Sequence, residues 1–462
     1  MQKKTLRLAL PLFGLAALSL SSSAQDFQPR MGEPMAGLSP AQLQRFADGL
    51  VEFNFVLGPA DGLGPVFNDN SCGTCHAFPE PGGSGTKLVT RFGKAAAGGN
   101  PFDPLANKGG SLKQEQAIDP ACQEFVPAEA DVVINRVTPM ALGLGFLEAI
   151  DDADILALAA SPLDPNVSGV VRMTQPFEGG PMRASKMGWK GGVSTTLTFS
   201  ADASLNEMGL TNRFVGSENL PNGDAALLVW DTVADPEDFP DPVTGLERID
   251  RQTDFQIFTA APPQTPRSGM TGEMVFSSIG CAACHVDTAY VTGAHTEAVL
   301  TGVSIKPYSD FLLHDMGALG DGIVDGICSE DEMMTRTLWG IGQRQTMLHD
   351  GRVTGVPFDA MVDWAIQEHD GEAAFTRTNW NALSVADQAA LVEFMKSLGR
   401  SEGDWDLNNR VDEFDWFFME PLMTGPDAGT VTPDDGGAII DIDQDGDIDM
   451  ADMAVFQRAY TF

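Results

Sequence analysis

The sequence SCGTCH, residues 71–76, has a second copy, GCAACH, at residues 280–285. Four of the six cysteines of the chain therefore lie in two copies of the pattern Cys-x-x-Cys-His. The two thiols of such a pattern can bond to the vinyl groups of one haem, while the histidine reaches the iron as an axial ligand. The sequence thus predicts two covalently bound c-type haems, with these attachment and axial residues: Cys72, Cys75 and His76, and Cys281, Cys284 and His285.

Two other kinds of site use closely spaced cysteines. Structural zinc would need further cysteine or histidine ligands near each pair, and a dithiol redox pair has no use for the histidine. Neither explains two copies of the whole pattern. The remaining cysteines, Cys122 and Cys328, are expected to form a disulfide in an oxidising compartment, although the sequence does not show whether they meet.

The start of the chain has the features of an export signal. Lys3, Lys4 and Arg7 precede an apolar run from Leu8 to Leu20, and small residues follow. We expect residues 1–24 to be a cleaved signal peptide and the mature protein to be periplasmic or secreted. The apolar run is shorter than the roughly 18 residues that a membrane-spanning helix needs, so an integral membrane protein is not expected.

The chain is strongly acidic, with a formal net charge of −37. This charge argues against nucleic-acid binding, because a polyanion would be repelled along most of the surface. It leaves open whether the acidity serves solubility or attracts a basic redox partner.

Helix signals flank the haem motifs. Ser39 and Pro40 are typical of a helix start, and apolar residues then recur at helical spacing as far as Phe53. Ser384 and Asp387 resemble a capping box that opens a second helix, with the apolar stripe Leu391, Phe394, Met395 and Leu398. The interval 77–270 is rich in Gly, Pro and Asp, and loops with short helices are expected there.

A second internal repeat occupies the C-terminal end. Oxygen donors recur at the spacing of EF-hand-type calcium loops, which predicts about two bound calcium ions. The candidate ligands are Asp404, Asp406, Asn408, Arg410, Asp412 and Asp415, and Asp441, Asp443, Asp445, Asp447, Asp449 and Asp452. Each loop leads into an apolar helical segment. An acidic, solvated tail would explain the charge but not the repeated spacing.

The two loop-helix repeats resemble a dockerin module, with a Pro/Gly/Asp linker at 424–437. This resemblance implies docking to a cohesin-like partner. The length of 462 residues also suits about three folded units. We expect an N-terminal haem domain with an insertion at 25–268, a second haem domain at 269–400 and the dockerin-like domain at 401–462.

The haem-containing part of the chain, about residues 32–400, resembles the bacterial di-haem oxidoreductase family, relatives of di-haem cytochrome c peroxidases and of MauG. The segments that carry the resemblance are GLGPVFNDNSCGTCH (62–76), GLGFLEAI (143–150), GWKGG (188–192), NEMGLTN (206–212), PYSDFLLHDMGALGDG (307–322), LWGIG (338–342), LHDGR (348–352) and AIQEHDGEA (365–373). The implied fold class is mainly α, with two cytochrome c-like helical haem domains and long loop-rich insertions, followed by the small α domain of calcium loops and helices.

The resemblance also implies roles for individual residues. Trp189 stands where the peroxidases place a Trp between their haems, which suggests an electron relay rather than an ordinary core residue. Glu207 matches their acid/base Glu, although two residues early, and a surface carboxylate is the alternative. Phe199 replaces a Gln of the relatives, which removes a polar group from the peroxide pocket.

The second haem is expected to have two histidine ligands. His369 stands where the peroxidases have a Met ligand, so we predict His285 and His369 as the axial pair, with Met361 and Met316 as alternatives. A histidine in place of a methionine lowers the haem potential. Arg352 is a candidate partner for a haem propionate.

Two histidines and one Arg-Thr pair also bear on the resemblance. His314 and His349 are expected to be structural or propionate-bonding residues. Arg336 and Thr337 stand where the family usually has two prolines, which weakens the match.

The predicted function is that of an exported di-haem enzyme that reduces hydrogen peroxide with electrons from a redox partner protein or a small donor. The sequence has no histidine between His76 and His285, so the first iron has no obvious second imidazole and is the expected peroxide site. A methionine, water or a distant histidine could still occupy its sixth position. Two alternatives stay open: a non-catalytic di-haem electron carrier, and a MauG-like oxidase of an organic or protein substrate.

Overall fold

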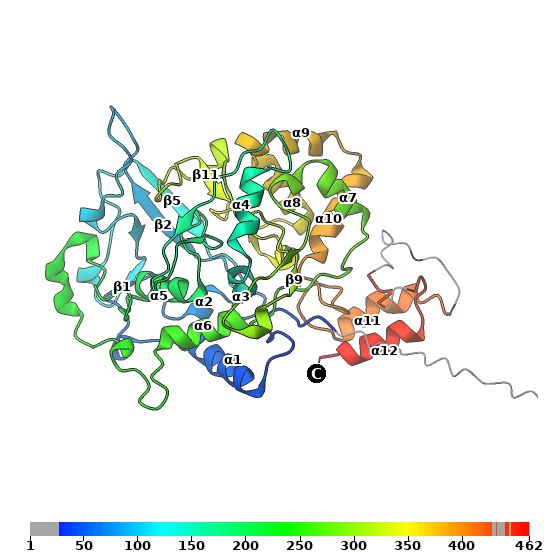
Figure 1. Cartoon of the computed structure of the whole chain (residues 1–462), viewed down its shortest axis with the longest axis horizontal. Helices are drawn as coiled ribbons and strands as arrows, with labels where there is room; N and C mark the ends of the chain where they lie inside the picture. Colours follow the sequence, from blue (N-terminus) through cyan, green and yellow to red (C-terminus); the bar gives the residue numbers. More distant parts are fainter. Residues whose placement is uncertain (1–26, 427–430, 432–438, 443–444, 462) are drawn as a thin grey trace, which may run out of the picture.

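The computed structural model describes residues 27–426, 431, 439–442 and 445–461 (Figure 1). The predicted signal peptide, most of the predicted linker and Asp443 lie outside these residues. The helices are α1 Pro40–Phe53, α2 Cys72–Cys75, α3 Leu144–Glu148, α4 Asp152–Ala160, α5 Thr196–Met208, α6 Arg248–Phe258, α7 Thr271–Ser278, α8 Phe358–Glu368, α9 Ala374–Ala382, α10 Val385–Ser397, α11 Glu413–Met419 and α12 Met450–Ala459. Among these described residues, none of the helices is long and apolar enough to cross a lipid bilayer.

Short antiparallel strands connect the helices. Their bounds are β1 Val66–Phe67, β2 Leu88–Gly93, β3 Leu112–Lys113, β4 Gln116–Ala117, β5 Val132–Val137, β6 Met173–Thr174, β7 Arg183–Ala184, β8 Tyr290–Val291, β9 Ser304–Ile305, β10 Leu313–Asp315, β11 Glu332–Met334, β12 Thr346–Met347 and β13 Val353–Thr354. The largest sheet has the order β3-β2-β5, with Leu88 opposite Val137 and Gly93 opposite Val132. The fold is thus helix-rich, as predicted, with small sheets that were not predicted.

The first core forms where α1 packs against α6. Helix α1 begins after Ser39, whose side chain accepts a hydrogen bond from the backbone N–H of Gln42, so the predicted helix start is confirmed. Phe53 of α1 lies with its ring centroid 4.7 Å from that of Phe255. Gly49 permits this close packing, because a Cβ there would lie 2.4 Å from the carbonyl oxygen of Arg251.

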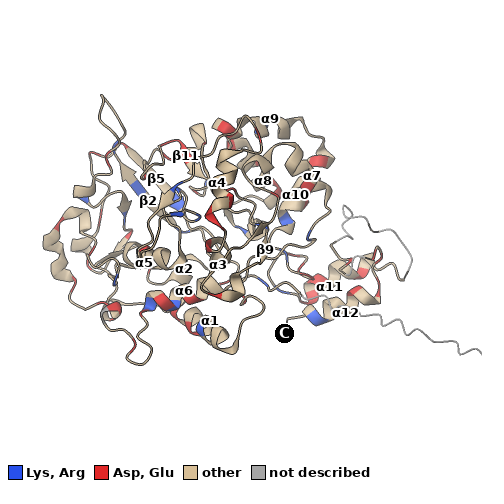
Figure 2. Ribbon diagram, viewed as in Figure 1, with Lys and Arg blue, Asp and Glu red and all other residues tan. Residues whose placement is uncertain are grey.

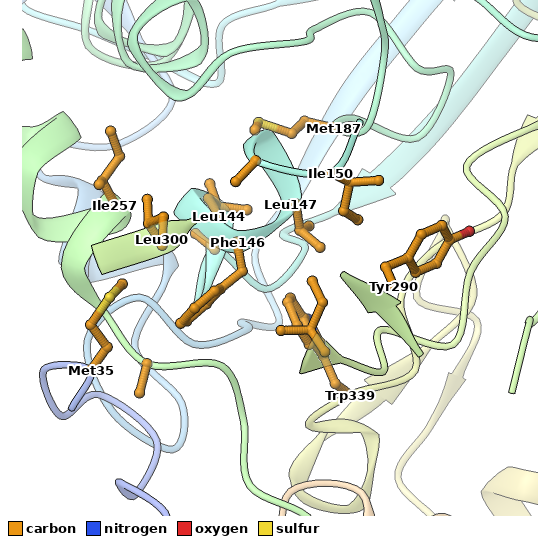
Figure 3. Close-up of a cluster of buried hydrophobic side chains, with 14 of the residues drawn as sticks. Met35, Leu144, Phe146, Leu147, Ile150, Met187, Ile257, Tyr290, Leu300 and Trp339 are labelled. Carbon is orange, nitrogen blue, oxygen red and sulfur yellow. The ribbon is translucent and has the colours of Figure 1, made fainter. Parts of the chain in front are cut away.

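The same core extends to α3, whose short turn carries Leu144, Leu147 and Ile150 into a cluster with Trp339 and Tyr290 (Figure 3). Trp339 and Tyr290 come from the second half of the chain, so the two halves share this core. The interval 77–270 was predicted to hold loops with short helices. It also contains α5, α6 and the β3-β2-β5 sheet, so that prediction is only partly correct.

The second core lies between α7, α8 and α10. The rings of Phe276 and Phe394 pack edge to face with centroids 5.4 Å apart, and Tyr308 lies against both. Ser384 caps α10 by accepting a hydrogen bond from the N–H of Asp387, as predicted. The predicted stripe of this helix is buried: Leu391, Phe394, Met395 and Leu398.

The C-terminal segment forms a third core around α11 and α12, in which Trp405 stacks on Phe456 at a centroid distance of 5.3 Å. Acidic residues mark the ribbon of this part of the chain (Figure 2). Hydrogen bonds join it to the main body: the side chain of Asn409 bonds both the N–H and the carbonyl of Met31. This segment is therefore packed against the main body.

The predicted disulfide between Cys122 and Cys328 is wrong. Both residues are buried free cysteines. The thiol of Cys122 faces the carbonyl oxygen of Leu227, and the thiol of Cys328 lies 3.3 Å from that of Glu332. The two thiols are thus held in separate surroundings, each as a small apolar side chain with a weak S–H donor.

Candidate functional site

Each Cys-x-x-Cys-His motif lines its own pocket. In the first, Ser71 caps α2 by accepting a hydrogen bond from the N–H of Thr74, and the helix presents Cys72 and Cys75 to the pocket. His76 follows as the C-terminal cap, and its Nδ1 lies 3.1 Å from the carbonyl oxygen of Gly83. Because a carbonyl can only accept, Nδ1 carries the proton and Nε2 keeps its lone pair. Burial lowers the pKa of His76, which maintains this neutral form.

The second pocket repeats this arrangement with two histidines. Cys281 and Cys284 lie on its wall with His285, whose Nδ1 donates to the carbonyl oxygen of Tyr308 at 3.0 Å. His369 lines the same pocket from the end of α8, and its Nδ1 donates to the carbonyl of Ala365 at 2.7 Å. Burial lowers the pKa of His285 to about 4 and also lowers that of His369. Both rings therefore offer a neutral Nε2, as axial iron ligands must.

Arginine side chains with buried Nε atoms also line the pockets, and haem propionates could pair with such cationic groups. Arg336 and Arg344 line the second pocket, and the Nε atoms of both are buried without a hydrogen-bond partner among the described residues. Burial lowers the pKa of Arg336 to about 9, and the positive charge of Arg344 contributes to this decrease. Burial also lowers the pKa of Arg344, to about 10. Arg91 has the same kind of unpartnered Nε in the wall of the first pocket. Buried guanidinium groups require anions, so these residues fit a haem with its carboxylates.

The propionate assignments from sequence need one correction. Arg352 does not line either pocket, and its guanidinium pairs instead with Asp350 at 2.6 Å and Glu368 at 2.7 Å. Sequence reasoning missed Arg344 altogether and treated Arg336 only as a departure from the family pattern. Nothing in the local sequence marks either residue as buried, because their burial depends on segments distant along the chain.

The two other histidines of the second pocket differ in their partners. His349 is buried, burial lowers its pKa to about 4, and its Nε2 has no hydrogen-bond partner among the described residues, as expected of a group that awaits a ligand atom. His314 is fully engaged, with Nε2 2.9 Å from Asp310 and Nδ1 3.0 Å from Glu372. His314 is therefore held as a structural residue in this wall.

Trp189 lines both pockets. Its indole N–H donates to the carbonyl oxygen of Val137 at 3.0 Å, and its own carbonyl accepts from the N–H of Met334 at 3.0 Å. Arg336 reaches across to the carbonyl of the preceding residue, Gly188. One hydrogen bond thus fixes the indole, and hydrogen bonds from the second half of the chain fix the backbone that carries it.

Glu207 and Phe199 lie on α5 and line the first pocket together with His76. Burial raises the pKa of Glu207, and a hydrogen bond from the Asn68 amide opposes that rise. Although Glu207 is partly exposed, it lines the pocket, and for that reason it is not an ordinary surface carboxylate. The benzyl group of Phe199 stands on the same wall and makes that part of the wall apolar.

Six of the predicted calcium ligands gather in two acidic clusters among the described residues of the C-terminal end. Carboxylate oxygens of Asp404, Asp406 and Asp415 lie within 4.8 Å of one another, as do those of Asp447, Asp449 and Asp452. The loops share a hydrogen-bond pattern, since Asp404 accepts from the N–H groups of residues 408 and 409 and Asp441 from those of residues 445 and 446.

The other predicted calcium ligands are placed differently. Asp412 caps α11, whereas Asp449 belongs to the second cluster and also caps α12. The side chain of Asn408 donates to Asp406, and Asp445 accepts from the N–H of Asp447. Arg410 was predicted to contribute at its loop position and lies beside Asp412 on a polar cavity wall. A cation would be held chiefly by the clustered carboxylates, whose oxygens suit calcium.

Of the comparisons with known proteins, the match to a family model supports the haem assignment. The family model described as "Di-haem oxidoreductase, putative peroxidase" matches residues 127–398. Among solved structures, hydrazine synthase of Kuenenia stuttgartiensis is 15% identical over 86% of this chain and 100% of that one, with a TM-score of 0.34. A MauG-like protein associated with microbial copper homeostasis is 14% identical over 56% of this chain and 89% of that one, with a TM-score of 0.28. No curated protein sequence matches.

Proposed function

Since the chain belongs to the di-haem oxidoreductase family, we propose that it reduces hydrogen peroxide in the first pocket with electrons that arrive through the second. The reaction consumes one peroxide, two electrons and two protons, and yields two waters. Bound haem supplies the redox-active iron in each pocket. The observation that carries the proposal is the difference between the pockets: His285 and His369 face the second, whereas His76 faces the first together with the carboxyl of Glu207.

The residues of the first pocket suit proton handling. A proton must move between the two oxygens of peroxide as their bond breaks, and a carboxylate beside them can accept and return it. Glu207 is assigned this role, and burial raises its pKa, which makes its carboxylate a stronger proton acceptor than an exposed one. Phe199 keeps one side of the space apolar, which limits the number of waters that compete for this carboxyl.

The residues between the pockets suit electron transfer. Trp189 lines both pockets and is held by backbone hydrogen bonds, so its ring can shorten a gap that would otherwise be crossed in one step. His285 and His369 would hold an iron on both faces, which leaves that pocket for electron entry instead of peroxide binding. A reduced partner protein or small donor would supply the electrons.

The remaining parts of the proposal concern location and docking. The basic and apolar start of the chain supports export to the periplasm or medium, where haem attachment to these motifs takes place. The two acidic clusters support the binding of two calcium ions that stabilise a dockerin-like module. The module would dock to a cohesin-like partner.

Replacing Glu207 by Gln tests the central assignment, because the amide keeps the size of the side chain and removes its acid/base function. We expect the rate of peroxide reduction to fall about 100-fold or more while both haems stay attached. Glu273→Gln is the matched control, since Glu273 pairs with Lys306 outside both pockets. Unchanged peroxide reduction in Glu207→Gln would refute the role of this carboxyl.

A further inference from the structure

Asn68 lies four residues before the first attachment cysteine and is completely buried. Its side-chain N–H₂ donates to Oε2 of Glu207 at 2.6 Å, and its backbone N–H donates to the carbonyl of the same residue at 2.7 Å. Its Oδ1 accepts from the N–H of Glu115 at 3.0 Å, and its carbonyl accepts from Nε2 of Gln116 at 2.8 Å. Asn68 therefore forms hydrogen bonds with both the backbone and the carboxyl of Glu207.

The end of α5 is docked on the same short segment. The N–H of Gly64 donates to the carbonyl of Met208, and that of Asp69 to the carbonyl of Glu207. Gly209 ends the helix with φ +66°, and a Cβ there would lie 2.6 Å from the carbonyl oxygen of Val66. Residues 64–69 thus fix the carboxyl-bearing end of α5 immediately before Ser71, the cap of the attachment helix.

This geometry places the attachment motif and the acid/base group in one rigid unit. We propose that Asn68 is the positioning residue for the reaction: its amide holds the Glu207 carboxyl in a fixed orientation at the first pocket and favours its ionised form. The inference rests on the proposed role of Glu207. It adds a residue that is not among those lining the first pocket.

The hydrogen bond also acts on the charge of the carboxyl. An N–H donor stabilises a carboxylate more than a carboxylic acid. Burial and the charge of Asp202 raise the pKa of Glu207, whereas Asn68, Arg91 and Lys87 lower it. The thiols of Cys72 and Cys75 also face Glu207 and would be thioethers in the haem-bearing protein. Loss of the Asn68 donor must therefore move the pKa of Glu207 further upward.

Two variants of the haem-bearing protein test this inference. Asn68→Ala removes the amide. Asn68→Asp keeps the acceptor for the N–H of Glu115 and replaces only the donor, so it preserves packing better and lets two carboxyls share a proton. We expect peroxide reduction at neutral pH to slow about tenfold or more in both. We also expect the acidic limb of the pH–rate profile to move to higher pH, because the carboxyl must be ionised to accept a proton.

Gln116→Ala is the matched control, since it removes a hydrogen bond to the Asn68 backbone and leaves the amide–carboxyl contact in place. It should keep the wild-type pH profile. An unchanged profile in Asn68→Asp with both haems attached would overturn the inference, as would a shift of equal size in Gln116→Ala.

A double variant separates this inference from the function on which it rests. If Asn68 acts through Glu207, Asn68→Asp should cause no further loss of rate in the Glu207→Gln background. An additive loss there would show that Asn68 acts by another route and would contradict the inference alone. Full activity of Glu207→Gln by itself would instead contradict the proposed function.

Discussion

The guanidinium carbon of Arg336 lies 5.7 Å from the centroid of the Trp189 ring, in the part of the chain that separates the two pockets. The contact is a cation–π arrangement with an Arg whose Nε is buried and has no hydrogen-bond partner among the described residues. A positive charge above the ring makes the indole harder to oxidise. If the indole relays electrons, as proposed, this charge favours brief electron passage over storage of a radical.

Replacing Trp189 by Phe should slow electron transfer between the two haems while both remain attached. The indole N–H and its bond to Val137 are lost, and the smaller ring leaves a gap between the pockets. We expect at least a tenfold slower transfer, measured by stopped-flow absorption after peroxide is mixed with protein reduced at the second haem. Trp339→Phe is the control, because Trp339 packs in the core and lines neither pocket. Equal transfer rates in Trp189→Phe and the unaltered protein would remove the indole from the path.

Replacing His369 by Ala should change the second haem from low spin to high spin. The ring of His369 is aimed into the second pocket by its hydrogen bond to Ala365, and its removal leaves one axial position open. Absorption and EPR spectra of the ferric protein would show the change. Met361→Leu is the control, because Met361 is packed in the core of the second half. If His369→Ala left the spectrum unaltered and Met361→Leu changed it, methionine would be the ligand.

Replacing Arg344 by Met should lower the reduction potential of the second haem. A buried positive charge favours the reduced iron, which carries one positive charge less. Arg344 stands in the wall of that pocket, and within the described part of the chain its Nε has no hydrogen-bond partner. Spectroelectrochemical titration measures the midpoint. Arg352→Met is the matched control, because Arg352 is already neutralised by Asp350 and Glu368. An effect as large in the control would refute the assignment of Arg344 to the haem carboxylates.

Removal of calcium should destabilise the C-terminal core in a pH-dependent way. Burial, with repulsion from Asp415, raises the pKa of Asp404 to about 7, and burial raises that of Asp415 to about 6. Because these values lie above those of unfolded aspartate, the calcium-free segment is most stable at low pH and loses stability as the pH rises through 6 and 7. At pH 8, calcium at 100 times its dissociation constant should restore about 2.7 kcal/mol per site.

Calorimetry with a chelator and with added calcium measures this effect. Asp404→Asn should weaken the response to calcium, and Asp287→Asn, at a residue of the main body that accepts from Ser277, should not. A thermal midpoint that is indifferent to calcium at pH 8 would contradict the calcium assignment.

The parts of the site that sequence could predict are those encoded within a few residues. Cys-x-x-Cys-His places two thiols and an imidazole in one turn, so the motif itself brings Cys72, Cys75 and His76 to one pocket. The caps Ser39 and Ser384 likewise depend on neighbours three residues away. In these cases the spacing of neighbouring residues is sufficient to predict the local structure.

The parts that could not be predicted depend on contacts between distant segments. The burial of Arg344, the separate surroundings of Cys122 and Cys328, and the pairing of β2 with β5 all arise from tertiary packing. Asn68 stands within the segment 62–76, and the role proposed for it depends on the docking of α5 against this segment.

The proposed chemistry requires that two haems are bound and that one of them is open to peroxide. Absorption and EPR spectra of the purified protein at stepped potentials measure both properties. We predict two haems per chain and, after reduction of one of them, a high-spin ferric signal that disappears on addition of peroxide. Two low-spin haems that do not react with peroxide at any potential would contradict the account and indicate an electron carrier.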